Sequence, residues 1–384
     1  MADLIATLSD LVRINSVNAF YENGPGEADL ARYVEGFFAR HGVETWQQNV
    51  IDATGAVEAR CNVIARLPGF DPSRRIVLEA HLDTVSVQGM TIAPFEPRVE
   101  DGRLYGRGSC DTKAGLAAMM HAVVNLKVQN VVPPCDVLLA AVVDEEYSFQ
   151  GVRRFCEELK ADAAIVAEPT DLRIAIASKG VLRWRIHARG KSAHSSKVHL
   201  GVNAIYHMAR VVLALEQTHA ALAHATHPLL GSASGSVGKI VGGVQVNFVP
   251  DHCVIEIDRR LLPMESIAEV WGHYEQVIDR LKQEVHDLDV RMEEPMLIDE
   301  AWAVDPSSAI VRVSRSVLHQ MAGNDEPIGV PFGSDASKLG RAGVPTIIFG
   351  PGSIDQAHAA VEYVEIKQVE KATEFYKRCL MEFR

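Results

Sequence analysis

The chain has 384 residues, of which 47% are hydrophobic and 23% are charged. This composition is typical of a globular protein with one large domain or two smaller ones, and it excludes a disordered or fibrous chain. The net charge of -12 argues against a nucleic-acid or anionic-membrane partner, because phosphate groups are bound by clustered Lys and Arg.

The first part of the chain predicts helices followed by alternating strands and helices. Two amphipathic helices come first, one from Asp3 to Arg13 and one that ends at Gly42. Apolar segments and helical patterns then alternate, in the order RRIVLEA before His81, a helix at 113–126, DVLLAAVV before Asp144, a helix at 149–159 and DAAIVA before Glu168. This alternation predicts an α/β fold with a sheet of buried, mostly parallel strands.

The pattern changes near residue 180. A longer strand (GVLRWRIHARG) is followed by a helix at 202–215, two strands (SVGKIVGG and DHCVIEIDRRL), a helix at 266–282 and a strand (DLDVRMEE). This βαββαβ order predicts a compact ferredoxin-like insert with its own sheet. The small-residue stretch GSASGSVG at 231–238 is predicted to be a loop.

After about residue 295 the chain returns to a helix, the strand VPTIIFG and a final helix at 365–382. We therefore predict a three-layer αβα catalytic domain in two parts, residues 1–179 and 296–384, interrupted by the insert of residues 180–295. Neither the first residues, MADLIATLSD, nor any later stretch resembles a signal peptide, a transit peptide or a membrane span of about 20 apolar residues. The six cysteines lack paired spacing, so we expect reduced thiols and a cytoplasmic protein.

Residues of the types that bind metal ions follow the predicted buried strands. Four strand ends lead into His81, into Glu145 and Glu146, into Glu168, and into a loop with His358. Asp111 lies where a glycine-rich turn enters a helix. In an α/β sheet the carboxyl ends of the strands form the ligand-binding edge, so these residues are expected to meet. A bridging carboxylate such as Asp111 would reduce the repulsion between two divalent cations.

Each of these residues also has an ordinary structural alternative. A single His after a strand is more often a hydrogen-bonded structural residue, Glu145 and Glu146 fit a solvated turn, and Asp111 fits a helix cap. The coincidence of all these positions favours the metal site, because a helix cap does not require metal-type ligands at four strand ends.

Eight motifs in order resemble a known family along nearly the whole chain. They are EAHLDTV, GRGSCDTKAG, VVDEEYSFQG, VAEPT, GKSAHSS, VNFVPD, IDRRLLP and GPGSIDQAHAAVEYV. As a set they resemble the dinuclear-zinc metallopeptidases and aminoacylases, which include acetylornithine deacetylase, succinyl-diaminopimelate desuccinylase and the folate-cleaving glutamate carboxypeptidase.

The resemblance implies two divalent metal ions, with zinc expected and cobalt or manganese as alternatives. One ion would be held by His81, Asp111 and Glu168. The other would be held by the shared Asp111 together with Glu146 and His358.

The resemblance also implies roles for three further residues. Asp83 would orient His81. Glu145 would be the general base, which takes a proton from a metal-bridging water and delivers it to the leaving nitrogen. The insert would be a lid that forms a homodimer, and its His194 would reach the partner's site and stabilise the tetrahedral oxyanion.

Asn247 and Arg260 match positions that bind substrate, and Arg260 suits a bidentate grip on a carboxylate. Arg259 lies on the opposite strand face and is the alternative, since a shift of one residue exchanges the two faces of a strand.

The first functional hypothesis is an amidohydrolase that cleaves a small N-acylated amino acid, as acetylornithine deacetylase and the desuccinylase do. A metallo-carboxypeptidase or dipeptidase acting on a short peptide with the same site is the nearest alternative. A catalytically silent dimeric binding protein is another, but such a protein has no need of Glu145. A magnesium-dependent phosphoryl-transfer enzyme is disfavoured because magnesium avoids histidine ligands.

Overall fold

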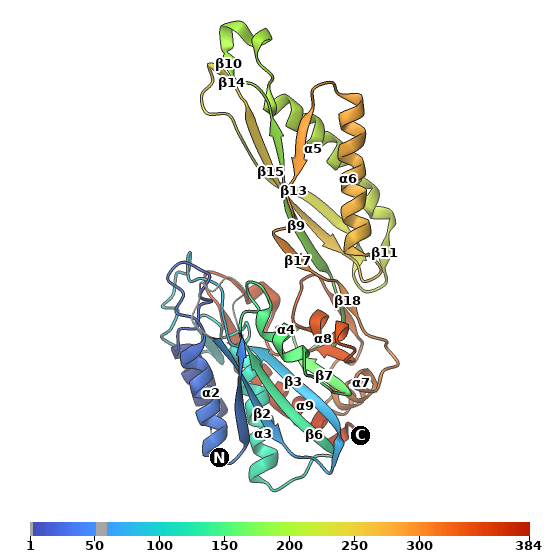
Figure 1. Ribbon diagram of the computed structural model, residues 1–384. Helices are drawn as coiled ribbons and strands as arrows, with labels where there is room; N and C mark the ends of the chain where they lie inside the picture. Colours follow the sequence, from blue (N-terminus) through green and yellow to red (C-terminus); the bar gives the residue numbers. More distant parts are fainter. Residues whose placement is uncertain (1–2, 51–59) are drawn as a thin grey trace. The chain divides into compact units, whose positions relative to one another are not determined.

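The computed structural model describes residues 3–50 and 60–384. By its internal contacts the chain divides into two units (Figure 1). The first comprises Met1–Ile176, Ala303–Ile328 and Ser334–Arg384, and the second comprises Ala177–Trp302 and Gly329–Gly333. The second unit is therefore inserted into the sequence of the first.

The first unit is built on a mixed sheet with the strand order β1-β2-β6-β3-β7-β20-β8-β18, in which the short β18 (Trp302–Ala303) and β19 (Ile328–Val330) both pair with β8. Its strands are β1 (Glu44–Val50), β2 (Arg60–Leu67), β3 (Asp71–His81), β6 (Cys135–Val142), β7 (Ala163–Val166), β8 (Ala175–Ser178) and β20 (Thr346–Ile348). The central strands β6, β3, β7 and β20 are parallel, whereas β1, β2 and β8 pair in the antiparallel sense. The predicted α/β class is confirmed, with the parallel strands confined to the centre of a mixed sheet.

Helices cover both faces of this sheet, so β6 and β7 are buried along their whole length. The helices of the described part of this unit are α1 (Leu4–Arg13), α2 (Ala28–Arg40), α3 (Lys113–Val128), α4 (Gln150–Cys156), α7 (Ala309–Gln320), α8 (Ala336–Arg341) and α9 (Ile366–Glu382). The nearly all-apolar α3 packs against α1 and α9, while α4 packs against α8. A small separate sheet has the order β21-β5-β4, with β4 at Arg98–Glu100, β5 at Arg103–Tyr105 and β21 at Tyr363–Glu365.

The second unit is a βαββαβ sandwich with the antiparallel strand order β13-β15-β9-β16. Its main elements are β9 (Gly180–Arg189), α5 (Ala204–Ala221), β13 (Ser234–Gly242), β15 (His252–Leu261), α6 (Ile267–Glu284) and β16 (Asp289–Met292). Shorter elements are β10 (Ala193–His194), β11 (Thr226–His227), β12 (Gly231–Ser232), β14 (Phe248–Val249) and β17 (Leu297–Asp299). The predicted ferredoxin-like order of elements is present.

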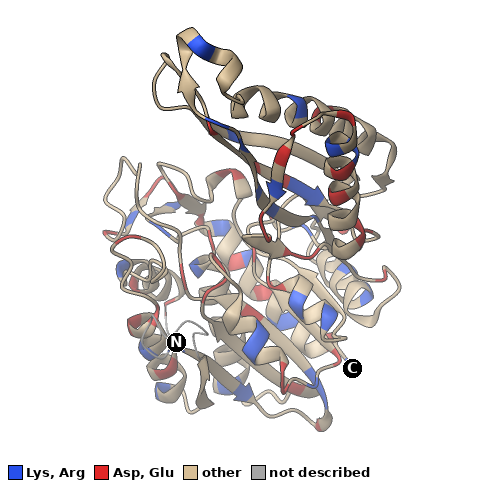
Figure 2. Cartoon of the chain, turned by 45° about the horizontal axis from the view of Figure 1, so that its top comes forward, with Lys and Arg blue, Asp and Glu red and all other residues tan. Residues whose placement is uncertain are grey.

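The strands of this unit alternate between a buried apolar face and an accessible charged face. Trp184 and Ile186 of β9 lie in the core beside Tyr274 of α6, where the rings of Trp184 and Tyr274 are 4.7 Å apart. On the other face, ion pairs join neighbouring strands, such as Arg183 with Asp258 at 2.7 Å. Figure 2 shows Lys and Arg interspersed with Asp and Glu on this unit.

One sequence prediction is wrong and several helix ends move. The stretch at 231–238, predicted as a loop, forms β12 and the start of β13, because pairing with β15 compensates the low strand propensity of Gly and Ser. The helix predicted at 149–159 is shorter in the structure, and the helix predicted at 202–215 is longer. Across residues 3–50 and 60–384, every helix falls short of the length and apolar character that a membrane span requires.

Candidate active site

The carboxyl ends of the parallel strands bring the predicted site residues of the first unit to one edge of the sheet. They are His81 at the end of β3, Glu145 and Glu146 after β6, Glu168 after β7, His358 in the loop after β20, and Asp111 just before α3. Because the four strands run in the same direction, residues that are far apart in the sequence converge at this edge.

The carboxylate of Asp111 lies between two imidazoles. Its Oδ1 is 3.1 Å from Nε2 of His81, and its Oδ2 is 3.3 Å from Nε2 of His358. Nε2 of His358 is also 3.1 Å from Oε1 of Glu146. Asp111 is buried, whereas the His358 side chain is 51% exposed, so the group is accessible from the His358 side.

Two sets of ligand atoms lie close enough to hold a cation. His81, Asp111 and Glu146 form one set, and His81, Glu145 and Glu168 form the other, with all atoms of each set within 4.8 Å of one another. His81 thus belongs to both sets, whereas the sequence predicted Asp111 as the shared ligand. The 3.3 Å approach of His358 to Asp111 brings the remaining predicted ligand to the same place.

The electrostatics of this group suit a cation. Burial raises the pKa of Glu168 well above its usual range, and the neighbouring charge of Asp111 raises it further. Burial would also raise the pKa of Asp111, but hydrogen bonds from His358 and His81 outweigh it and hold that pKa below its usual range. Hydrogen bonds to Asp111 and Glu146 raise the pKa of His358 to about 11. The crowded carboxylates therefore favour the binding of a cation at this edge of the sheet.

Asp83 supports the site, although its contacts differ from the prediction. Nδ1 of His81 is 3.0 Å from the main-chain oxygen of Asp83 and 3.5 Å from its Oδ1. The carboxylate accepts hydrogen bonds from the backbone N–H of Glu145 at 3.1 Å and from that of Glu146 at 3.0 Å. Asp83 therefore holds the segment that carries both glutamates, in addition to contacting His81.

An outer layer of buried polar residues lies behind Asp83. The Asn18 amide donates to Oδ2 of Asp83 at 2.7 Å and to Oδ1 of Asp144 at 3.0 Å. Arg60 donates to Asp144 at 3.0 Å and pairs with the carboxylate of Glu27. No sequence pattern indicated this layer, because its members lie in irregular segments or at a strand end and are brought together only by the tertiary fold.

His194 lies in the second unit, exposed, on β10. Its Nδ1 accepts a hydrogen bond from the backbone N–H of Ser196 at 3.2 Å and is 2.8 Å from Oγ of the same residue. In a neutral imidazole that accepts at Nδ1, the proton is carried by Nε2. His194 is therefore suited to donate a hydrogen bond from Nε2.

Arg260 and Arg259 occupy opposite faces of β15. Arg259 is 1% exposed and pairs with Glu265, so it belongs to the core of the second unit. Arg260 lies on the accessible face, where its Nε is 2.8 Å from Oδ1 of Asp258. Asn247 is exposed, just before β14. Of the two arginines, Arg260 is the one that a ligand can reach.

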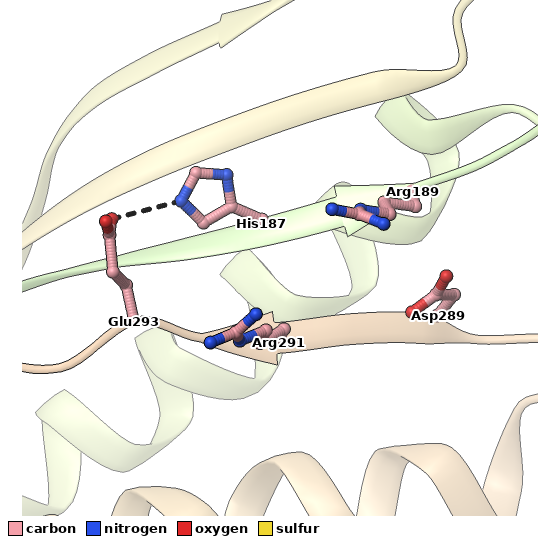
Figure 3. A pocket seen from close by; sticks show the side chains of 5 residues that line it. All are labelled: His187, Arg189, Asp289, Arg291 and Glu293. Atoms are coloured by element: carbon pink, nitrogen blue, oxygen red, sulfur yellow. Dashed lines mark hydrogen bonds and ion pairs between the residues drawn. The ribbon is translucent and has the colours of Figure 1, made fainter.

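The second unit also has a surface hollow of about 280 Å³ outside the predicted site (Figure 3). Its lining residues project from β9 and from β16 with the segment after it: His187, Arg189, Asp289, Arg291 and Glu293. His187 contacts Glu293 at 3.2 Å. Because charges of both signs line this hollow, its chemistry selects no single class of ligand.

An α/β sheet whose strand ends gather imidazoles and carboxylates around one shared carboxylate, with an inserted second unit, defines a hydrolase of the metallopeptidase class. Residues 77–382 match the model of peptidase family M20/M25/M40, and the chain belongs to this family. The chain is thus an enzyme that hydrolyses amide or peptide bonds.

Known proteins resemble the chain over nearly its whole length. An acetylornithine deacetylase of Myxococcus xanthus is 29% identical over 399 residues, which cover 99% of this chain and 97% of that protein. A probable succinyl-diaminopimelate desuccinylase of Staphylococcus aureus is 25% identical over 413 residues, with 99% and 97% covered. The crystal structure of a tripeptidase from Staphylococcus aureus has the same fold, with a TM-score of 0.81 at 21% identity and with 98% and 97% covered.

Proposed function

We propose that the chain is a metal-dependent amidohydrolase that cleaves the amide bond of an N-acyl amino acid and releases a carboxylate and a free amine. The observation that carries this proposal is the carboxylate of Asp111 between the imidazoles of His81 and His358. The deacetylase and desuccinylase named above support an acylated amino acid as the substrate, because at 29% and 25% identity they are more similar in sequence to the chain than the tripeptidase at 21%.

The donor set fits two divalent cations. We assign one ion to His81, Asp111 and Glu168, and the other to Asp111, Glu146 and His358, as the family resemblance implies. The proximity of His81 to Asp111 and to Glu168, and of His358 to Asp111 and Glu146, supports this assignment. Imidazole and carboxylate ligands suit zinc, and cobalt or manganese accept the same donors. Such ions, when bound, supply Lewis acidity that polarises a substrate carbonyl and acidifies water.

Glu145 is our candidate for the general base. Burial raises the pKa of its carboxyl well above the usual range; His81 opposes this shift and Glu146 adds to it. Its carboxylate lies with His81 and Glu168 in one of the two ligand sets, so it is placed to take a proton from the attacking water and return it to the leaving nitrogen. The hydrogen bond from its backbone N–H to Asp83 fixes the main chain from which this carboxylate extends.

We propose that residues 180–295 act as the lid. Arg260 would bind the substrate carboxylate through its guanidinium group, and Asn247 would add a hydrogen bond from its amide. His194 would stabilise the oxyanion of the tetrahedral intermediate, since its Nε2 carries the proton in the tautomer that Ser196 selects.

We also propose that the lid forms a homodimer. β13 is at one end of the sheet of the second unit, so its outer edge has free hydrogen-bonding groups. Apolar side chains near this edge are exposed, including Ile240 at 55%, Val244 at 93% and Phe248 at 46%. A second copy of the chain would cover these side chains and pair with the edge.

We place the enzyme in the cytoplasm and in amino-acid metabolism. All six cysteines lie in the described part of the chain and are free thiols, four of them buried. Unpaired thiols are typical of a reducing compartment. The names of the deacetylase and the desuccinylase support a role in amino-acid metabolism.

The test combines metal content with hydrolysis of N-acetylornithine, N-acetylcitrulline, N-succinyl-diaminopimelate, N-acetylmethionine and a dipeptide. We expect Glu145→Gln to bind metal like the wild type and to lose about 100- to 10,000-fold in kcat, because a general base contributes that much. Glu158→Gln, which removes an exposed carboxylate paired with Arg154, should keep full activity. A protein that binds no divalent metal refutes the proposal, and turnover of the dipeptide alone would make the chain a peptidase.

A further inference from the structure

A strand pairing places Glu362 beside the loop that carries Asp111. β21 pairs with β5 so that Tyr363 lies opposite Tyr105, and the backbone N–H of Gly106 donates to the main-chain oxygen of Glu362 at 3.1 Å. The loop from residue 106 to residue 111 leads directly from β5 to the bridging carboxylate. Glu362 itself is fully buried and lies four residues after His358 in the sequence.

Both oxygens of the Glu362 carboxylate are occupied by donors of this loop. Oε2 accepts from Nη1 of Arg107 at 2.7 Å and from the backbone N–H of Gly108 at 3.0 Å. Oε1 accepts from the backbone N–H of Cys110 at 2.9 Å and from that of Asp111 at 3.1 Å. One buried side chain therefore satisfies three main-chain donors within four consecutive residues, the last of which is Asp111 itself.

The loop lies outside the helices and strands, and other main-chain hydrogen bonds hold its first part: the N–H of Arg107 donates to the oxygen of Pro94 at 2.8 Å, and that of Ser109 donates to the oxygen of Gly106 at 3.1 Å. Gly108 has a φ of 79°, and a Cβ atom there would lie 2.9 Å from carbons of Lys113 and Thr84, so the loop is tightly packed. The amides of Gly108, Cys110 and Asp111 point instead to the Glu362 carboxylate. Glu362 therefore holds the end of the loop that carries Asp111, and with it the main chain from which the Asp111 side chain extends.

We propose that Glu362 is a positioning residue that holds the Asp111 carboxylate between His81 and His358, so that the bridging ligand is preorganised for its cations. This inference rests on the proposed metal site. It differs from the predicted ligand roles, because Glu362 acts on the main chain of Asp111 and contacts neither imidazole among its hydrogen-bond partners. Residues that orient metal ligands in this way typically contribute a factor of about 10 to 100 in metal affinity.

The test measures zinc affinity of the full-length, metal-depleted protein by competition with a chromophoric chelator. Glu362→Gln keeps the size of the side chain but replaces one acceptor with an NH₂ group that faces N–H donors. We expect its zinc affinity to fall about 10- to 100-fold, and kcat at limiting zinc to fall with it, while KM under zinc saturation changes little. Glu365→Gln, in the same segment but on a half-exposed pair with Arg103, is the matched control and should bind zinc like the wild type.

Each outcome separates this inference from the proposed function. If the wild type binds no zinc, the proposed site and the role of Glu362 both fail. If the wild type binds zinc and Glu362→Gln binds it equally well, only the role of Glu362 fails. If metal-depleted Glu362→Gln does not fold, Glu362→Asp decides: it keeps the charge but shortens the reach, so an affinity equal to that of the wild type would refute the positioning role.

Discussion

Replacing Asn18 with Ala should destabilise the first unit by about 3–5 kcal/mol. The Asn18 side chain is fully buried and its amide donates to two buried carboxylates, Asp83 at 2.7 Å and Asp144 at 3.0 Å. A hydrogen bond to a charged group contributes about 1.5–3 kcal/mol, and the truncation leaves both acceptors with one donor fewer. Asp83 keeps the amides of Glu145 and Glu146, so the loss is partial.

Urea unfolding of the metal-depleted protein, followed by circular dichroism, measures this loss. The control is Asn15→Ala, which removes one half-exposed acceptor of the Val17 backbone N–H at 3.0 Å and should cost about 1 kcal/mol or less. Asn18→Asp has nearly the same shape but places a third carboxylate beside Asp83 and Asp144. Its free energy of unfolding should be lower than that of Asn18→Ala at pH 8 and should rise as the pH falls. Equal midpoints for Asn18→Ala and Asn15→Ala would refute the reasoning.

Three further predictions concern stability. Burial raises the pKa of Glu27 from 4.5 to about 7. The folded protein therefore binds this proton more tightly than the unfolded chain does. As a result, the contribution of Glu27 to the free energy of unfolding falls as the pH rises from 4.5 to 7. Glu27→Gln should therefore flatten the pH dependence of the unfolding free energy in that window, measured by urea titrations at several pH values. Tyr376→Phe should cost about 1–2 kcal/mol in the same assay, because its hydroxyl donates to the buried oxygen of Phe349 at 2.6 Å. Free zinc at 100 times its dissociation constant should raise the free energy of unfolding by about 2.7 kcal/mol. An unfolding midpoint that does not change when a chelator removes the zinc would contradict this prediction.

Periodicity predicted the elements of the chain well because most of them bury one continuous apolar surface. In the helix after Asp3 the buried residues recur with helical spacing, and in the strand before His81 they form one continuous, mostly apolar run. The prediction of a loop at 231–238 was wrong because Gly and Ser give no hydrophobic periodicity. Its strand is determined by the partner β15, where Ser234 lies opposite Arg260, and a pairing across 26 residues leaves no trace in local composition.

The site residues were predictable where chemistry and topology coincide. Imidazoles and carboxylates at the ends of buried strands are unusual enough to indicate a ligand site, and parallel pairing brings them together. Asn18 gave no such signal. Its place is set by main-chain hydrogen bonds, from its N–H to the oxygen of Thr84 and from the N–H of Thr84 to the oxygen of Ser16, both at 3.0 Å. These contacts join segments that are far apart in the sequence, so only the structure reveals them.

The two kinds of supporting residue follow from one electrostatic requirement. A cation site needs several carboxylates within a few ångströms, and without the cation each raises the proton affinity of the others. The pKa of Glu168 is raised first by burial and then by the charges of Asp111 and Glu145. The fold must therefore hold the carboxylates in place by groups other than the cation. Asn18 does so indirectly, because it donates to Asp83, whose carboxylate accepts from the amides of Glu145 and Glu146, whereas Glu362 accepts from the backbone N–H of Asp111. Because Glu362 contacts the backbone N–H of Asp111 and not its carboxylate, both carboxylate oxygens of Asp111 face the two imidazoles.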